Sequence, residues 1–148
     1  MRGAMVGVLL AVLVLPACGG DGFKPECGAI QPVASASLAR VPGELELTKL
    51  GTVTGVRVDA PQVTATLQLD ATVGDATTKV QRHFTGLGWQ VANTDNEGFE
   101  AEIFVVRDAD TGLVNIREAD CDGRVTLDVT IVPATPAPSA SPSASPSR

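Results

Sequence analysis

The sequence predicts an α+β domain in which one helix packs on an antiparallel β-meander, with additional strands on the N-terminal side of the helix. In residues 73–87 apolar side chains recur at three- and four-residue steps, which is the spacing of an amphipathic helix. Four segments after it alternate apolar and polar residues and are separated by short turns, which favours antiparallel neighbours. The helix is therefore expected to cover one face of the sheet.

Three strands are expected before the helix. Residues 44–48 alternate Glu and Leu, and residues 62–69 alternate over a longer run. Residues 53–58 are rich in β-branched side chains, but the alternation slips by one at Gly55, which predicts a β-bulge. A turn is expected at Asp59-Ala60-Pro61, between the second and third of these strands.

The predicted helix spans residues 73–86. Thr72, followed three residues later by Asp75, forms a variant of the capping box in which Asp replaces Glu. Gly86 and Gly88 are expected to end the helix. Its apolar stripe comprises Val73, Ala76, Val80, Phe84 and Leu87.

The meander is expected to contain strands that start at Trp89 and that span residues 99–107, 113–117 and 124–132. Turns rich in Asp, Asn and Gly separate them. Alternation gives such a sheet one dry face and one solvated face. The side chains expected on the dry face are Phe99, Ala101, Ile103, Val105, Val114, Ile116, Val125, Leu127, Val129 and Ile131.

The N-terminal residues have the three-part pattern of a secretory signal peptide. Arg2 supplies a positive charge, residues 3–17 are uncharged, and residues 6–15 are almost entirely Val, Leu and Ala. This apolar run is shorter than the approximately 20 residues that a transmembrane helix needs.

The run ends in Leu15-Pro16-Ala17-Cys18, which resembles the lipobox of bacterial lipoproteins. The resemblance implies that residues 1–17 are removed, that Cys18 carries a diacylglycerol, and that the mature chain lies on the extracytoplasmic face of the cell membrane. A diacylated cysteine supplies the two acyl chains that stable attachment requires. The alternatives are plain secretion, with Cys18 free or in a disulfide, and an uncleaved anchor.

Two cysteines remain once Cys18 is lipidated. An even pair in an exported protein predicts a disulfide, here between Cys27 and Cys121. It would close a loop of about 95 residues, which corresponds to roughly 4.5 kcal/mol in the chain-entropy treatment. The alternative is two free thiols.

Composition divides the mature chain into three parts. Residues 18–40 are rich in Gly, Ala, Ser and Pro and are expected to form a tether. Residues 41–132 are expected to form the α+β domain. Residues 133–148 contain almost only Pro, Ala, Ser and Thr and are expected to be a disordered tail, or alternatively a glycosylated one.

The charge of the mature chain limits its partners. Without Arg2 it has ten Lys and Arg against seventeen Asp and Glu, a formal charge of −7. This excess argues against nucleic-acid binding, which needs a basic surface. It also argues against electrostatic docking on anionic lipid, so the acyl chains at Cys18 are expected to hold the protein.

The ionisable residues do not form a recognisable catalytic set. His83 is the only histidine, and it lies near the edge of the helical stripe. Asp108-x-Asp110 resembles the start of a calcium loop, but the later ligand positions hold Gly, Leu and Ala, so an Asp-rich hairpin turn is favoured. The same interpretation applies to Asp120 and Asp122. No metal and no cofactor is therefore expected.

Two carboxylates share the outward face of one predicted strand. Glu100 and Glu102 would lie roughly 7 Å apart, a separation that some glycosidases use. Arg107, Arg117 and Arg124 occur on neighbouring strands, so cross-strand ion pairs are the favoured interpretation.

These observations favour a small non-enzymatic binding or accessory module, monomeric and anchored to the membrane. Its partner would be an extracytoplasmic protein or a small ligand that meets the charged sheet face. A helix, then Gly88-Trp89, then a meander is similar to the compact domains of many actinobacterial lipoproteins, and this resemblance implies no activity. The alternative is a carrier of lipid or another apolar ligand. An enzyme is disfavoured.

Overall fold

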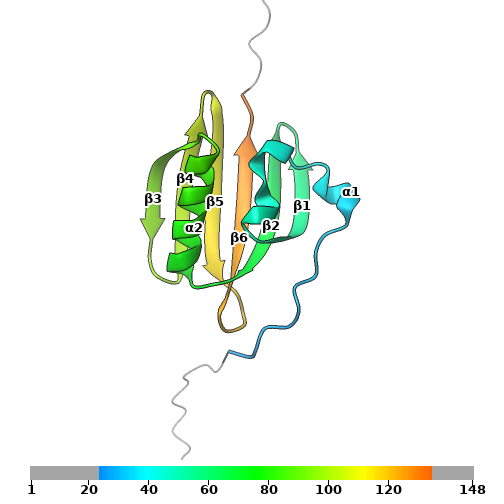
Figure 1. The fold of residues 1–148 in the computed structure, drawn as a ribbon, viewed down its shortest axis with the longest axis vertical. Helices are drawn as coiled ribbons and strands as arrows, with labels where there is room; N and C mark the ends of the chain where they lie inside the picture. The colour runs from blue at the N-terminus through cyan, green and yellow to red at the C-terminus, as the bar shows by residue number, and fades with distance from the viewer. Residues whose placement is uncertain (1–23, 135–148) are drawn as a thin grey trace, which may run out of the picture.

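The computed structural model describes residues 24–134, which form a six-stranded antiparallel sheet with helical segments on one face (Figure 1). The predicted signal peptide, Cys18 and residues 135–148 lie outside the described residues. Across the sheet the strands are β1 (Thr52–Asp59), β2 (Gln62–Asp70), β6 (Arg124–Val132), β5 (Asp110–Glu118), β4 (Glu100–Arg107) and β3 (Gln90–Asn96).

The sheet combines a hairpin and a meander. β1 and β2 form the hairpin, and α2 (Val73–Gly86) then crosses the sheet to the far edge. From there β3, β4, β5 and β6 pair in sequence, and β6 completes the sheet by pairing with β2. The predicted antiparallel meander is confirmed, and residues 53–58 and 62–69 lie in β1 and β2.

The predicted helix is confirmed over residues 73–86. Thr72 Oγ1 accepts a hydrogen bond from the amide of Asp75 at 3.2 Å, so the predicted N-cap forms. The Asp75 carboxylate accepts from the Thr72 hydroxyl at 2.8 Å, in place of the bond from the Thr72 backbone amide that a capping box has. Gly88 follows with φ of 82°, a conformation that favours glycine and ends the helix. The stripe from Val73 to Phe84 is buried against the sheet.

The strand predicted over residues 44–48 is wrong. Two 3-10 helices, η1 (Gly43–Leu45) and η2 (Leu47–Lys49), occupy this region, with Glu46 between them in the left-handed conformation. Leu45, Leu47 and Leu50 are all buried in the core. The backbone carbonyls here are bound by side chains of α2: Lys79 Nζ donates to Leu50 O at 2.8 Å, and His83 Nε2 lies 2.8 Å from Leu45 O.

The dry face of the meander is confirmed with one exception. Ala101, Ile103 and Val105 are buried as predicted, but Phe99 is 58% exposed. Phe99 lies in the turn between β3 and β4, one residue before β4 begins at Glu100. The irregularity predicted at Gly55 is confirmed, since the β1–β2 register shifts between Val53 and Gly55.

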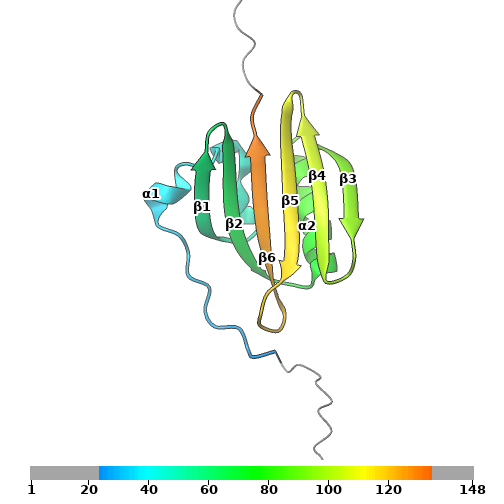
Figure 2. The same ribbon diagram turned by 180° about the vertical axis from the view of Figure 1, so that it is seen from behind.

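The core lies between α2 and the sheet. Phe84 of α2 packs edge-to-face on Trp89, with ring centroids 5.7 Å apart, and the Arg107 guanidinium lies 4.6 Å from the centroid of the Trp89 ring. None of the helices within residues 24–134 has the length and hydropathy to cross a membrane. α1 (Ser35–Leu38) lies beside β1, and the opposite face of the sheet has no covering element from residues 24–134 (Figure 2).

Candidate functional site

A disulfide joins Cys27 of the predicted tether to Cys121. Cys121 lies in the loop between β5 and β6, so this pairing connects the N-terminal extension to the last hairpin. The predicted disulfide is confirmed.

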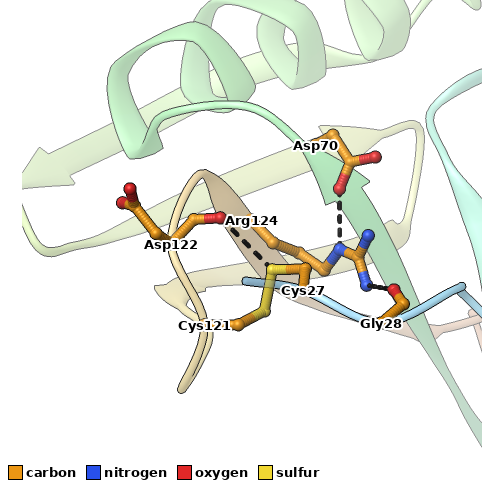
Figure 3. A network of polar contacts seen from close by, with 6 residues as sticks. All are labelled: Cys27, Gly28, Asp70, Cys121, Asp122 and Arg124. Carbon is orange, nitrogen blue, oxygen red and sulfur yellow. Dashed lines mark hydrogen bonds and ion pairs between the residues drawn. A yellow bond between two sulfur atoms is a disulfide. The ribbon is translucent and has the colours of Figure 1, made fainter. Parts of the chain in front are cut away.

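Polar contacts around the disulfide attach the tether to the sheet (Figure 3). Arg124 Nε donates to Asp70 Oδ1 and Arg124 Nη1 donates to Gly28 O, both at 2.7 Å. The Arg124 side chain is only 10% exposed, and it links the tether to β2 and β6. We call this region the tether clamp; it comprises residues 24–28 with Asp70, Glu118, Cys121, Asp122 and Arg124.

Two further contacts complete the tether clamp. The amide of Asp122 donates to Pro25 O at 3.0 Å, within a short parallel bridge between Glu26 and Asp122. Lys24 forms an ion pair with Glu118 at the end of β5. The clamp thus holds residues 24–28 at the end of the sheet where β5 turns into β6.

The sheet face opposite α2 is the second candidate site, and we call it the open face (Figure 2). The buried residues of each strand face α2, so the alternate residues point outward. The outward residues include Thr64 and Thr66 of β2, Asp128 and Thr130 of β6, Asn115 and Arg117 of β5, and Glu100, Glu102 and Phe104 of β4.

Asp128 lies at the centre of the open face. It accepts hydrogen bonds from Thr66 Oγ1 at 2.8 Å and from Arg117 Nη2 at 2.7 Å. A shallow hollow lies on each side of it. One is lined by Glu100, Glu102, Asn115 and Arg117, and the other by Gly55, Arg57, Thr64, Thr66 and Thr130.

One end of the open face is apolar. Phe104 is 40% exposed and lies directly opposite the half-buried Leu113 of β5. Val132, which is 36% exposed, and Val106 both lie opposite Thr111, one step further along the strands. We call these four side chains the apolar end: Phe104, Val106, Leu113 and Val132.

The other part of β4 is acidic, and its carboxylates form no ion pair with their neighbours in the described part of the chain. Asp95 of β3 lies directly opposite Glu102, a like-charged pair that destabilises a sheet. Glu100 lies opposite Arg117, but the guanidinium of Arg117 binds Asp128. Within residues 24–134, none of these three carboxylates takes part in an ion pair.

The predicted partners of Glu100 and Glu102 were therefore wrong. Arg107, Arg117 and Arg124 all form ion pairs, but with aspartates: Asp110 at 3.7 Å, Asp128 at 2.7 Å and Asp70 at 2.7 Å. The sequence did not single out Asp70 or Asp128. Their positions on adjacent strands were the signal that could have identified them.

The other residues considered for chemistry have structural roles. His83 binds the backbone of η1 through Nε2, Asp108 has a φ of 56° in the two-residue turn between β4 and β5, and Asp110 accepts a hydrogen bond from the amide of Ala134 at 2.8 Å. In the described part of the chain, no three His, Cys, Asp or Glu side chains are placed to hold a metal ion.

A third hollow lies between the end of β2 and α2. Its lining combines the ionisable side chains of Asp70, Asp75, Lys79, Arg82 and His83 with Leu69, Ala71 and Thr78. The space directly under α2 is filled, because Val73, Ala76, Val80 and Phe84 are buried there.

Comparison with family models, with curated proteins and with solved structures found no match for this chain.

Proposed function

We propose that this chain is a lipoprotein anchored through Cys18 on the extracytoplasmic face of the cell membrane, where it acts as a small non-enzymatic binding module. The open face is the surface that binds, and the partner is a protein that offers basic and apolar side chains. The observation that carries this proposal is the exposed apolar end beside three carboxylates that form no ion pair within residues 24–134.

The size of the open face suits a protein partner. Six strands spaced about 4.8 Å apart and strands about 30 Å long give a flat area of roughly 700 Å². A standard protein interface buries about 800 Å² on each partner. The open face alone thus approaches the area that a specific complex needs.

Its chemistry is divided between the two halves. Phe104 supplies the exposed aromatic side chain that an interface core uses. Asp95, Glu100 and Glu102 supply negative charge, and the repulsion between Asp95 and Glu102 would be relieved by a cation placed between them. A partner with Lys or Arg beside an apolar side chain complements both halves.

Site-specific photo-crosslinking on whole cells tests this function. A photoreactive amino acid at Asn115 or Thr130 reports on the open face, and one at Thr78 reports on the exposed side of α2. We expect a discrete protein adduct from the open face and not from α2.

A matched pair of substitutions gives the control. Phe104→Ala is expected to abolish the adduct, whereas Phe99→Ala, at an exposed Phe outside the apolar end, is expected to leave it unchanged. Equal adducts from both faces, or an adduct that survives Phe104→Ala, would contradict the proposed surface.

A further inference from the structure

The tether clamp and the apolar end lie at opposite ends of the sheet. Cys121 follows the end of β5, whereas the turn at Asp108 and Ala109 precedes its start. β5 has nine residues, so the two turns are about 30 Å apart. Figure 1 shows residues 24–28 approaching from the end of the sheet opposite the one where β6 stops.

The chain between Cys18 and the tether clamp is short. Pro25, which accepts the hydrogen bond from the Asp122 amide, is seven residues beyond Cys18, and seven residues span at most about 24 Å when fully extended. We call this segment between Cys18 and the tether clamp the leash. Its maximum length is smaller than the distance between the two ends of the sheet. The leash is therefore too short for the domain to invert and bring the end of the sheet that carries Ala109 against the surface that holds Cys18.

We propose that the tether clamp fixes which end of the domain faces the membrane: the loop of Cys121 lies toward it, and the turn of Asp108 and Ala109, with the apolar end, is presented outward. This inference rests on the proposed lipid attachment at Cys18. It deepens the proposed function, because it places the partner away from the membrane and excludes a partner that lies within the headgroup layer.

The disulfide is the component of the clamp that makes it durable. The Lys24–Glu118 ion pair is exposed, with 40% and 49% of the side chains accessible, and exposed ion pairs contribute little. If residues 24–28 detach once the disulfide is removed, the next backbone contact to the sheet is the hydrogen bond from the Val33 amide to Val53 O at 2.8 Å. The leash would then run fifteen residues from Cys18 to Val33, about 50 Å when extended, which exceeds the length of the sheet.

The charge at the clamped end is consistent with a spacer and not with a lipid-binding surface. Asp120 and Asp122 flank Cys121 and are exposed. Carboxylates at this end are repelled by anionic headgroups. The clamp thus holds the acidic end of the domain near the membrane, and the carboxylates at this end keep the domain from adhering to the headgroups.

Photo-crosslinking to lipid tests the orientation. With Cys27 and Cys121 oxidised, Cys18 is the only free thiol of the mature chain, so residues 18–148 can be coupled to phosphatidylcholine vesicles that contain a maleimide-headgroup lipid. A photoreactive amino acid replaces either Asp120, beside the clamp, or Ala109, at the far turn. We expect lipid labelling from Asp120 and a large loss of labelling from Ala109.

Two variants lengthen the leash in independent ways. The double variant Cys27→Ser and Cys121→Ser removes the disulfide, and a Gly/Ser insertion of roughly 20 residues after Gly22 lengthens the tether with the fold untouched. Both are expected to raise labelling from Ala109 to the level of Asp120. The insertion keeps the test decisive if the double variant is unstable.

Equal labelling from the two positions in the oxidised protein would overturn the proposal, as would no labelling from Asp120. Lipid labelling from Ala109 that stays low in both lengthened variants would also overturn it. Because the coupling is chemical, these results do not depend on lipidation in the cell. That step is tested separately by fractionation of the Cys18→Ser variant.

Discussion

Removal of the disulfide gives the sharpest stability prediction. Cys27 and Cys121 are 94 residues apart, and the chain-entropy treatment assigns roughly 4.5 kcal/mol to a loop of this length. That figure assumes that the native structure of the disulfide-free protein is unchanged, with the tether still bound to the sheet.

The contacts of the tether clamp suggest a smaller loss. If residues 24–28 detach when the disulfide is absent, the native state regains the freedom of the short segment between Cys27 and Val33. The disulfide then closes a loop of 94 residues in the unfolded state but only the six-residue segment from Cys27 to Val33 in the native state. The difference in loop entropy is (3/2)RT ln(94/6), about 2.5 kcal/mol. We therefore predict that the Cys27→Ser and Cys121→Ser variant loses about 2.5 kcal/mol of unfolding free energy.

Urea denaturation of the mature chain, with Cys18→Ser in both proteins to prevent dimerisation, measures this difference. Hydrogen exchange at the amide of Asp122, which donates to Pro25 O, reports separately whether the tether has detached. A loss below about 1 kcal/mol would refute the loop argument. A loss near 4.5 kcal/mol with protection at Asp122 retained would show that the tether stays bound, and would refute the role of the disulfide in setting the leash.

The remaining predictions concern packing, capping, anchoring and ligand content. Gly112→Ala places a Cβ 2.7 Å from a side-chain atom of β4 and 2.8 Å from one of β6, so we expect a loss of about 1–3 kcal/mol in urea denaturation. Gly74→Ala, whose Cβ would meet nothing within 4 Å, is its control, and an equal loss in both would contradict the packing argument. Thr72→Ala removes the N-cap of α2 and is expected to cost about 1 kcal/mol in the same assay, whereas Thr72→Ser should retain most of it. Cys18→Ser is expected to move the protein from the membrane fraction to the soluble fraction or to block its processing, and unchanged membrane retention would contradict lipid anchoring. Native mass spectrometry of the folded domain is expected to show no bound lipid.

The helix and most strands were predictable because their signals are local. The stripe from Val73 to Phe84 has the period of a helix, and β6 alternates without a break from Arg124 to Ile131. Such periods follow from backbone geometry and need no knowledge of neighbours. The cysteine pair was predictable for a different reason: the expectation of export favours disulfides, and the expected lipidation of Cys18 left only Cys27 and Cys121 to pair.

The region of Leu45 and Leu47 shows where local reasoning fails. Its alternation is real, and both leucines are buried. The backbone, however, is bound by Lys79 and His83 of α2, and a contact between residues almost 40 positions apart leaves no mark in a five-residue pattern. Burial was predictable here, whereas the type of secondary structure was not.

The ion pairs of the open face could not be predicted from the sequence, for a geometric reason. Strand register places Glu100 opposite Arg117, one of the three arginines that the sequence analysis placed on neighbouring strands. Arg117 nevertheless reaches diagonally to Asp128 on β6, a neighbour that long side chains can contact. The outward face of each strand was predictable, but the choice between a direct and a diagonal partner depends on three strands together.

The packing under α2 favours a surface binder over a carrier of apolar ligands. A carrier would have to lift α2 from the sheet, which exposes Val73, Ala76, Val80 and Phe84. At about 1.5–3 kcal/mol for each of the larger side chains, this exposure costs about 5–9 kcal/mol. The whole stability of a domain of this size is about 5–15 kcal/mol, so lifting the helix amounts to unfolding much of the protein. A ligand is therefore expected to bind the surface that is already exposed, and a lipid found in native mass spectra would contradict this reasoning directly.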